Sequence, residues 1–271
     1  MTTFRRRKPR LTKNLPSNVT PLRRNDWAGP EQENLGRPRN RGIYLLPNAF
    51  TTANLFCGFF AIVQAMNQRF EFAAIAIFVA LVMDGMDGRV ARMTNTQSAF
   101  GEQYDSLTDM VSFGVAPGLI LFQLLRISFA AEPDGLDTPM YWMLPALLLP
   151  MAAAWRLARF NLDTKDRGHF VGLPVPAAGL LIAVLPLLML YNPFDVQLVI
   201  INRWFLYALI GAISWLMVSA LPLLNLKFKN YSFTDNKARY ILLALAIPFI
   251  LILGWLAVPT IFITYILVSL L

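Results

Sequence analysis

The chain has 271 residues, of which 56% are hydrophobic and 15% charged, and its mean hydropathy is +0.50. A soluble domain carries about 25% charged residues, so this composition excludes an ordinary soluble protein and indicates an integral membrane protein. A single cysteine, Cys57, and a single histidine, His169, exclude a disulfide framework, a thiolate metal cluster and a histidine-based metal site.

The first 44 residues are strongly basic. They hold eleven Lys or Arg against three acids, and this excess of +8 equals the net charge of the whole chain. Because the segment is poor in apolar residues, we expect 1–44 to be disordered or interfacial, with a short interfacial helix near 36–48. Such a tail favours contact with anionic membrane lipids. No aromatic stacking pattern accompanies the charge, so we expect no nucleic-acid partner.

Long apolar segments follow this tail. We predict eight transmembrane helices, at 49–67, 71–92, 105–127, 140–160, 173–191, 204–222, 240–256 and 257–271. As one helix the segment 240–271 would be about 48 Å long, which is too long for one upright crossing and short for two. Gly254 and Pro259 would place a turn within it, and seven spans is the alternative. The expected fold is an all-α polytopic bundle over 45–222 with a C-terminal extension over 223–271.

The basic residues also predict the orientation in the membrane. The N-terminal segment and the alternate loops that follow it hold 21 of the 24 Lys and Arg, whereas the other side has Arg69, Arg126 and Arg203. The positive-inside rule therefore places the N-terminus and the segment 84–109 on the cytoplasmic side.

Four aspartates lie within 84–109, where charge beside lipid is costly and therefore indicates function. Asp84 and Asp87 are spaced i, i+3, and Asp105 and Asp109 are spaced i, i+4, so each pair shares one helix face. Clustered carboxylates are the ligands that hard divalent cations prefer, and such ions bridge protein acids to substrate phosphates. The segment therefore predicts a metal site for a phosphate-containing substrate.

The spacing of these residues carries a family resemblance. The pattern Asp-x2-Asp-Gly-x2-Ala-Arg-x8-Gly-x3-Asp-x3-Asp, from Asp84 to Asp109, resembles the signature of the CDP-alcohol phosphotransferases. Within that family the chain resembles the bacterial integral-membrane phosphatidylserine synthases, in 46–48, 54–58, 104–117, 155–161 and 172–176. The resemblance implies a six-helix core, usually in a homodimer, with one or two extra C-terminal helices here.

The resemblance also implies roles for individual residues. Asp84, Asp87 and Asp105 would bind Mg²⁺ or Mn²⁺, two ions in all, and Asp109 would reach a metal and act as the general base. The CDP-diacylglycerol pocket would be lined by the signature residues Gly88, Ala91, Arg92 and Gly101 and completed by the first-span polar residues Asn48, Thr51 and Asn54. The implied location is a bacterial cytoplasmic membrane.

The implied reaction transfers the phosphatidyl group of CDP-diacylglycerol to the hydroxyl of L-serine and releases CMP. Serine needs a cation for its carboxylate, and the candidates are Arg156 and Arg159, at i, i+3, with Asn161 beside them. The other interpretation of the two arginines is that they snorkel to the interface as topology signals.

Two other functions fit the sequence. A sister transferase would use glycerol 3-phosphate or an inositol phosphate as acceptor. A divalent-cation transporter would use the carboxylates as its transport site, although such sites usually lie near mid-membrane between related repeats.

Overall fold

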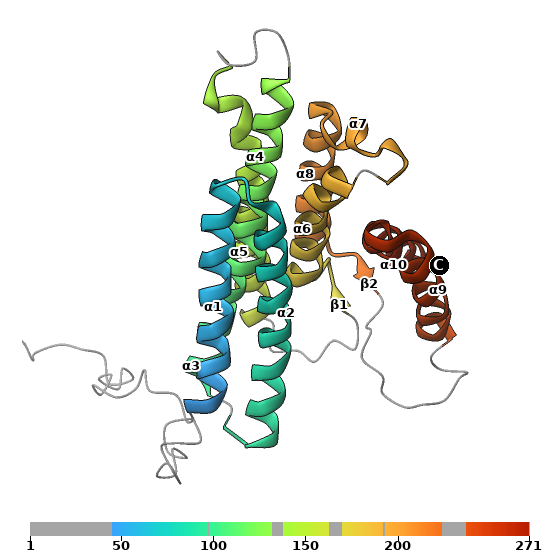
Figure 1. Cartoon of the computed structure of the whole chain (residues 1–271). Helices are drawn as coiled ribbons and strands as arrows, with labels where there is room; N and C mark the ends of the chain where they lie inside the picture. Colours follow the sequence, from blue (N-terminus) through green and yellow to red (C-terminus); the bar gives the residue numbers. More distant parts are fainter. Residues whose placement is uncertain are drawn as a thin grey trace, which may run out of the picture. The chain divides into compact units, whose positions relative to one another are not determined.

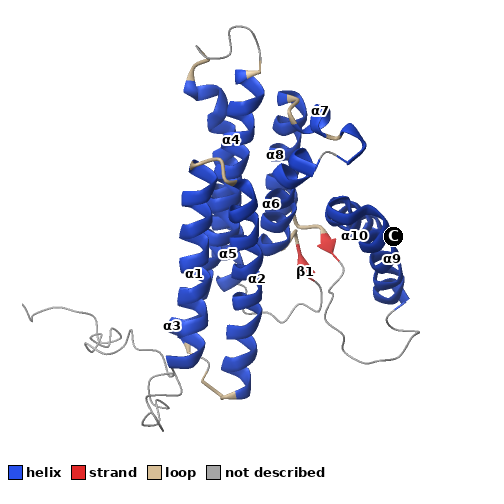
Figure 2. Ribbon diagram, viewed as in Figure 1, coloured by secondary structure: helices blue, strands red, loops and turns tan. Residues whose placement is uncertain are grey.

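The structure, a computed structural model, describes residues 45–96, 98–131, 138–162, 170–191, 193–223 and 237–270, and nearly all of them are helical (Figures 1 and 2). The longer helices are α1 (Leu45–Met66), α2 (Phe70–Met93), α3 (Ala99–Asp109), α4 (Ala116–Ala130), α5 (Leu148–Leu162), α6 (Val175–Tyr191), α8 (Arg203–Val218), α9 (Lys237–Leu253) and α10 (Ala257–Leu270). The shorter segments are η2 (Met110–Val115), η4 (Met140–Leu147), η5 (Pro193–Asp195), α7 (Gln197–Ile200) and η6 (Gly254–Leu256). The predicted interfacial segment 1–44 lies outside the described residues.

The segment 99–130 forms one continuous helical rod rather than the predicted span 105–127. It begins at Ala99 because Ser98 is extended and its hydroxyl accepts the backbone N–H of Gly101 at 3.0 Å, which caps the first turn. The middle of the rod, η2, is a turn of π-helix that joins α3 to α4. Such turns are rare and are frequent at functional sites.

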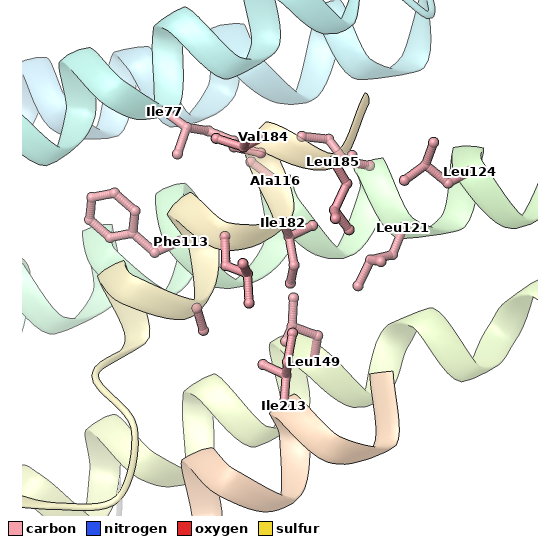
Figure 3. Close-up of a cluster of buried hydrophobic side chains, with 14 of the residues drawn as sticks. Ile77, Phe113, Ala116, Leu121, Leu124, Leu149, Ile182, Val184, Leu185 and Ile213 are labelled. Carbon is pink, nitrogen blue, oxygen red and sulfur yellow. The ribbon is translucent and has the colours of Figure 1, made fainter. Parts of the chain in front are cut away.

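The rod 99–130 is the centre of the bundle. Its α4 part contacts α1, α5, α6 and α8. Figure 3 shows Phe113 of η2, Leu149 of α5, Ile182 of α6 and Ile213 of α8 in one cluster of buried hydrophobic side chains. A Cβ atom added to Gly179 would lie 3.0 Å from Phe113, so glycine lets α6 approach the rod closely. The site described below therefore adjoins a buried hydrophobic cluster at the centre of the bundle.

The outer faces of the helices are apolar. Within the described residues, three helical stretches are long and apolar enough to cross a membrane, namely Leu46–Met66, Ala99–Ala130 and Leu242–Ser269, and shorter apolar helices span Val175–Tyr191 and Arg203–Val218. Large side chains such as Phe56, Phe72, Phe78, Trp155 and Leu251 are exposed. Apolar surface on this scale marks a lipid-facing protein, so the chain is an integral membrane protein, while the count of eight spans stays a prediction.

The C-terminal segment bends where the sequence suggested a turn. Gly254, the first residue of η6, has φ +55°, a conformation that favours glycine, and α10 begins directly after η6. The helices α9 and α10 contact each other, and α10 also contacts α6. Strands β1 (Phe170–Val171) and β2 (Pro222–Leu223), which precede α6 and follow α8, form an antiparallel pair, and α10 packs against β2 as well.

Candidate active site

Three carboxylates from two helices converge within the bundle. Asp84 lies in α2, and Asp105 and Asp109 lie one turn apart on the same face of α3. Each offers an oxygen within 4.8 Å of an oxygen from both of the others. The predicted clustering of these three acids is therefore present in the structure.

Cations of the described residues do not balance the charge of this cluster. Among the described residues, no Lys or Arg forms an ion pair with Asp84, Asp105 or Asp109. Oδ1 of Asp105 is buried and has no hydrogen-bond partner in the same part of the chain. Carboxylates this close repel one another, and oxygen-rich sites of this kind suit a hard divalent cation. The donor set therefore fits a metal ion.

Asp87, the remaining predicted metal ligand, lies beside the cluster and is held by α1. It is 5% exposed, and its Oδ2 accepts a hydrogen bond of 2.8 Å from the Thr51 hydroxyl. Thr51 Oγ1 also lies 3.2 Å from the carbonyl oxygen of Pro47, one turn back in α1. Thr51 therefore fixes the orientation of one Asp87 oxygen.

Asn54 is the second contact from α1 to the acids. It is fully buried, and its Nδ2 donates to Oδ1 of Asp109 at 3.2 Å, while its own Oδ1 has no partner among the described residues. The Ser112 hydroxyl, in the π-helical turn, donates to the backbone oxygen of Asn54 at 3.1 Å. A Cβ on Gly58 would overlap the Ser112 hydroxyl oxygen, so only glycine permits this approach of α1 to η2.

The remaining predicted pocket residues lie around the same helix ends. A Cβ on Gly101 would be 3.9 Å from Oδ1 of Asn48, so the α1 and α3 ends are adjacent there. Arg92 is exposed, and its Nε donates to the backbone oxygen of Gly88 at 2.9 Å within α2. Ala91 is half-buried beside it. In this structure the exposed Arg92 side chain therefore contacts its own helix.

The three predicted acceptor residues of α5 have different surroundings. Arg156 is 9% exposed, and its Nη2 lies 3.5 Å from the backbone oxygen of Gly172, whereas Arg159 is exposed. Asn161 bonds to α3, since its Nδ2 donates to Ser106 Oγ at 3.1 Å and to Gln103 Oε1 at 3.3 Å. The two arginines therefore differ in exposure, and their role in binding an acceptor stays a prediction.

Several contacts at the site were not anticipated from the sequence. They are the Ser112 bond to the Asn54 backbone, the Asn161 bond to Ser106, and the 3.0 Å contact between the hydroxyls of Thr52 and Tyr104. Each joins segments more than fifty residues apart, which periodicity along one helix does not reveal. The small residue Gly58, seven positions after Thr51, was the available signal for a close helix contact.

Comparison with known proteins gives the family. The family model for CDP-alcohol phosphatidyltransferase matches residues 44–223. A CDP-diacylglycerol–serine O-phosphatidyltransferase of Helicobacter pylori strain J99 is 40% identical over 148 residues, 54% of this chain and 59% of the relative. One from Mycobacterium tuberculosis H37Rv is 33% identical over 223 residues, 79% of this chain and 73% of the relative. An archaetidylserine synthase of Methanothermobacter thermautotrophicus is 29% identical over 178 residues, which are 65% of this chain and 68% of the relative.

The family match covers the helices that carry the site. The match with the Helicobacter relative spans 59% of the length of that relative. The family match covers α1 to α8, with all four aspartates of the signature. The signature and the converging carboxylates agree with that match. This chain belongs to the CDP-alcohol phosphatidyltransferase family.

Proposed function

We propose that this protein transfers the phosphatidyl group of CDP-diacylglycerol to the hydroxyl of L-serine, which yields phosphatidylserine and CMP. The observation that carries the proposal is the convergence of Asp84, Asp105 and Asp109 within a lipid-facing bundle. The family match supports phosphatidyl transfer, and the printed names of the bacterial relatives support serine as the acceptor.

Asp84, Asp105 and Asp109 would hold a divalent metal, and Asp87 would share in binding a second ion. Family members generally use divalent metals, and we propose Mg²⁺ or Mn²⁺ here because both prefer carboxylate and phosphate oxygens. The bound metal would neutralise the charge of the diphosphate and of the leaving CMP. Thr51 holds Asp87 in place for this role through its 2.8 Å hydrogen bond.

Asp109 would act as the general base. Its Oδ1 is fixed by the Asn54 amide, and the carboxylate is 8% exposed, so it sits in a site shielded from bulk water. The serine oxygen attacks the lipid-bearing phosphorus, its proton passes to Asp109, and the bond from that phosphorus to the CMP oxygen breaks. Direct attack inverts the configuration at phosphorus, so retention would contradict this mechanism.

The nucleotide would lie between α1, α2 and α3. Gly88, Ala91 and Gly101 leave room for its approach, Asn48 and Asn54 offer amide groups, and Arg92 can release Gly88 to bind a phosphate oxygen. The distribution of basic residues supports a cytoplasmic location for this site, in the inner membrane, with the N-terminus on the same side. We also propose the homodimer that is usual in the family.

The proposed acceptor residue is Arg156 rather than the Arg156–Arg159 pair. Arg156 is buried and its Nε has no hydrogen-bond partner among the described residues, so it can receive the serine carboxylate. Arg159 is exposed, which fits a snorkelling topology residue. Asn161 packs α5 on α3 and orients Arg156 indirectly.

The test is CMP release by the purified protein in detergent with CDP-diacylglycerol and Mg²⁺ or Mn²⁺. Serine, glycerol 3-phosphate, inositol phosphate and no acceptor are compared, with and without a chelator. We expect CMP release that needs both serine and the metal. CMP release with another acceptor would support phosphatidyl transfer and refute serine as the acceptor. No CMP release under any condition would contradict a transferase activity and favour a cation transporter.

A further inference from the structure

Asn54 of α1 is contacted twice by the rod 99–130. Its side-chain Nδ2 donates to Oδ1 of Asp109 at 3.2 Å, and its backbone oxygen accepts the Ser112 hydroxyl at 3.1 Å. Asp109 is the last residue of α3, and Ser112 lies in the π-helical turn η2 that follows it. One residue of α1 is therefore held at its backbone by the rod while its side chain holds the carboxylate of Asp109.

The Asn54 amide has no second anchor among the described residues. Its Oδ1 has no hydrogen-bond partner there, and its Nδ2 bonds to Asp109. Because an amide held by one hydrogen bond can still turn about its side-chain torsions, its direction depends on where the backbone of α1 lies. The Ser112 hydroxyl bonds to that backbone at residue 54 itself. Loss of the Ser112 bond is therefore expected to move the Asn54 amide relative to Asp109.

The bond from Ser112 needs an uncovered carbonyl group in α1. In an α-helix, the side chain of residue i+4 lies close to the carbonyl oxygen of residue i, as Thr52 does in this helix, where its hydroxyl donates to the Asn48 oxygen at 2.7 Å. Position i+4 from Asn54 is Gly58, which has no side chain. A Cβ there would lie 3.0 Å from Ser112 Cα and would overlap the Ser112 hydroxyl oxygen. Gly58 therefore opens the Asn54 carbonyl to a donor from η2.

The π-helical turn η2 sets the direction of the Ser112 side chain. A π-helix forms its hydrogen bonds between residues i and i+5 instead of i and i+4, so each turn holds more residues. The side chains after Asp109 are therefore rotated relative to an unbroken α-helix, and Ser112 reaches the same residue of α1 that the Asp109 carboxylate reaches. Since Ser112 and Asn54 are both fully buried, water does not compete for their hydrogen bond, which favours a fixed orientation.

We propose that Ser112 is a positioning residue for Asp109, the base of the proposed reaction. Its hydroxyl holds the backbone of Asn54 against η2, so that the Asn54 amide keeps the Asp109 carboxylate in a fixed direction when the acceptor hydroxyl arrives. This role rests on the proposed function. It makes the π-helical turn part of the support of the base, in addition to its packing against α1.

The test compares Ser112→Ala with the wild type in the CMP-release assay at saturating metal. Because a small displacement of a catalytic group slows the reaction without weakening substrate binding, we expect kcat to fall about tenfold, with the KM values for serine and CDP-diacylglycerol within about twofold of the wild type. The Tm should fall by about 2–4 °C, since one neutral hydrogen bond is lost while the helical bond of the Asn54 carbonyl remains. In an Asn54→Ala background, Ser112→Ala should change kcat less than about twofold, because no amide is left to position.

The matched control is Ser128→Ala, which removes the hydroxyl of another buried serine of the same rod, about 24 Å further along it. It should leave all three kinetic constants unchanged. An unaltered kcat in Ser112→Ala would overturn the positioning role, and so would a loss of kcat that is equally large in the Asn54→Ala background. A wild type that releases no CMP would refute the proposed function and the positioning role with it, whereas the other two outcomes refute the positioning role alone.

Discussion

Replacing Asp105 by Asn should stabilise the metal-free protein and abolish most of its stabilisation by metal. Oxygens of Asp84, Asp105 and Asp109 lie within 4.8 Å of one another, and no Lys or Arg of the described residues is paired with them. At an effective dielectric constant of about 20, two unit charges at 4.8 Å repel by about 3 kcal/mol. Water and small cations screen part of this, so we expect a net gain of about 1–2 kcal/mol for the metal-free variant.

The assay is thermal unfolding in detergent, with a chelator and with Mg²⁺ or Mn²⁺. A gain of 1–2 kcal/mol corresponds to a rise of about 3–6 °C in the Tm of the chelated protein. The wild type should be stabilised strongly by metal because binding to the folded state alone shifts unfolding, and Asp105→Asn should respond weakly. Glu71→Gln, an exposed acid in the first turn of α2, is the matched control for loss of one negative charge.

The reasoning fails if Asp105→Asn unfolds at the same or a lower temperature in chelator while its metal response matches that of the wild type. That result would mean that the three carboxylates do not share one ion. A lower Tm in chelator together with loss of the metal response would instead show that Asp105 has a packing role as well, since its buried Oδ1 has no partner among the described residues.

Three further changes test the site. Asp109→Asn should lower kcat at least about 100-fold in the CMP-release assay while part of the metal-induced Tm shift survives, because the base is lost but two acids remain. Gly58→Ala should cost about 1–3 kcal/mol of stability by overpacking against Ser112, whereas Gly211→Ala, with nothing within 4 Å of its added Cβ, should be neutral or stabilising in the same melts. Arg156→Lys should raise the KM for serine about tenfold or more, and Arg159→Lys should not, as measured by serine titration.

The acids were predictable because their signal is local. An i, i+4 pair in a helix must share a face, so Asp105 and Asp109 could be placed together without a fold. The approach of Asp84 to them was expected from the family signature, and the structure brings the three together. The positions of the long helices were predicted for the same reason, since whole apolar segments identify them.

The different burial of Arg156 and Arg159 was not predictable. Positions i and i+3 differ by about 60° around a helix, and at the edge of a packed face this rotation separates a buried from an exposed residue. Which of the two faces the core depends on α6 and on the Gly172 turn, which lie elsewhere in the sequence. Sequence spacing alone therefore predicted a pair where the structure has one buried arginine.

The start of the long rod was missed for a related reason. The predicted span began at residue 105, where the apolar run begins, but the helix starts at Ala99 because Ser98 caps it. The polar first turns extend the helix beyond the apolar run, and they bring Gly101 beside Asn48. The π-helical turn at Met110–Val115 has no sequence signal of its own, yet it places Ser112 against Asn54.

The first helix shows why the site can exist in an apolar bundle. Asn48, Thr51, Asn54 and Gly58 follow one another at intervals of three or four, so they form one stripe on α1. Within the stripe, Thr51 donates a hydrogen bond to Asp87 and Asn54 donates one to Asp109. Gly58 leaves space for Ser112. The opposite face of α1 is apolar and exposed. The acids are therefore oriented by a helix that presents its polar stripe inward and its apolar face to lipid. A polar-to-apolar substitution on the stripe should damage the site without altering how α1 lies in the membrane.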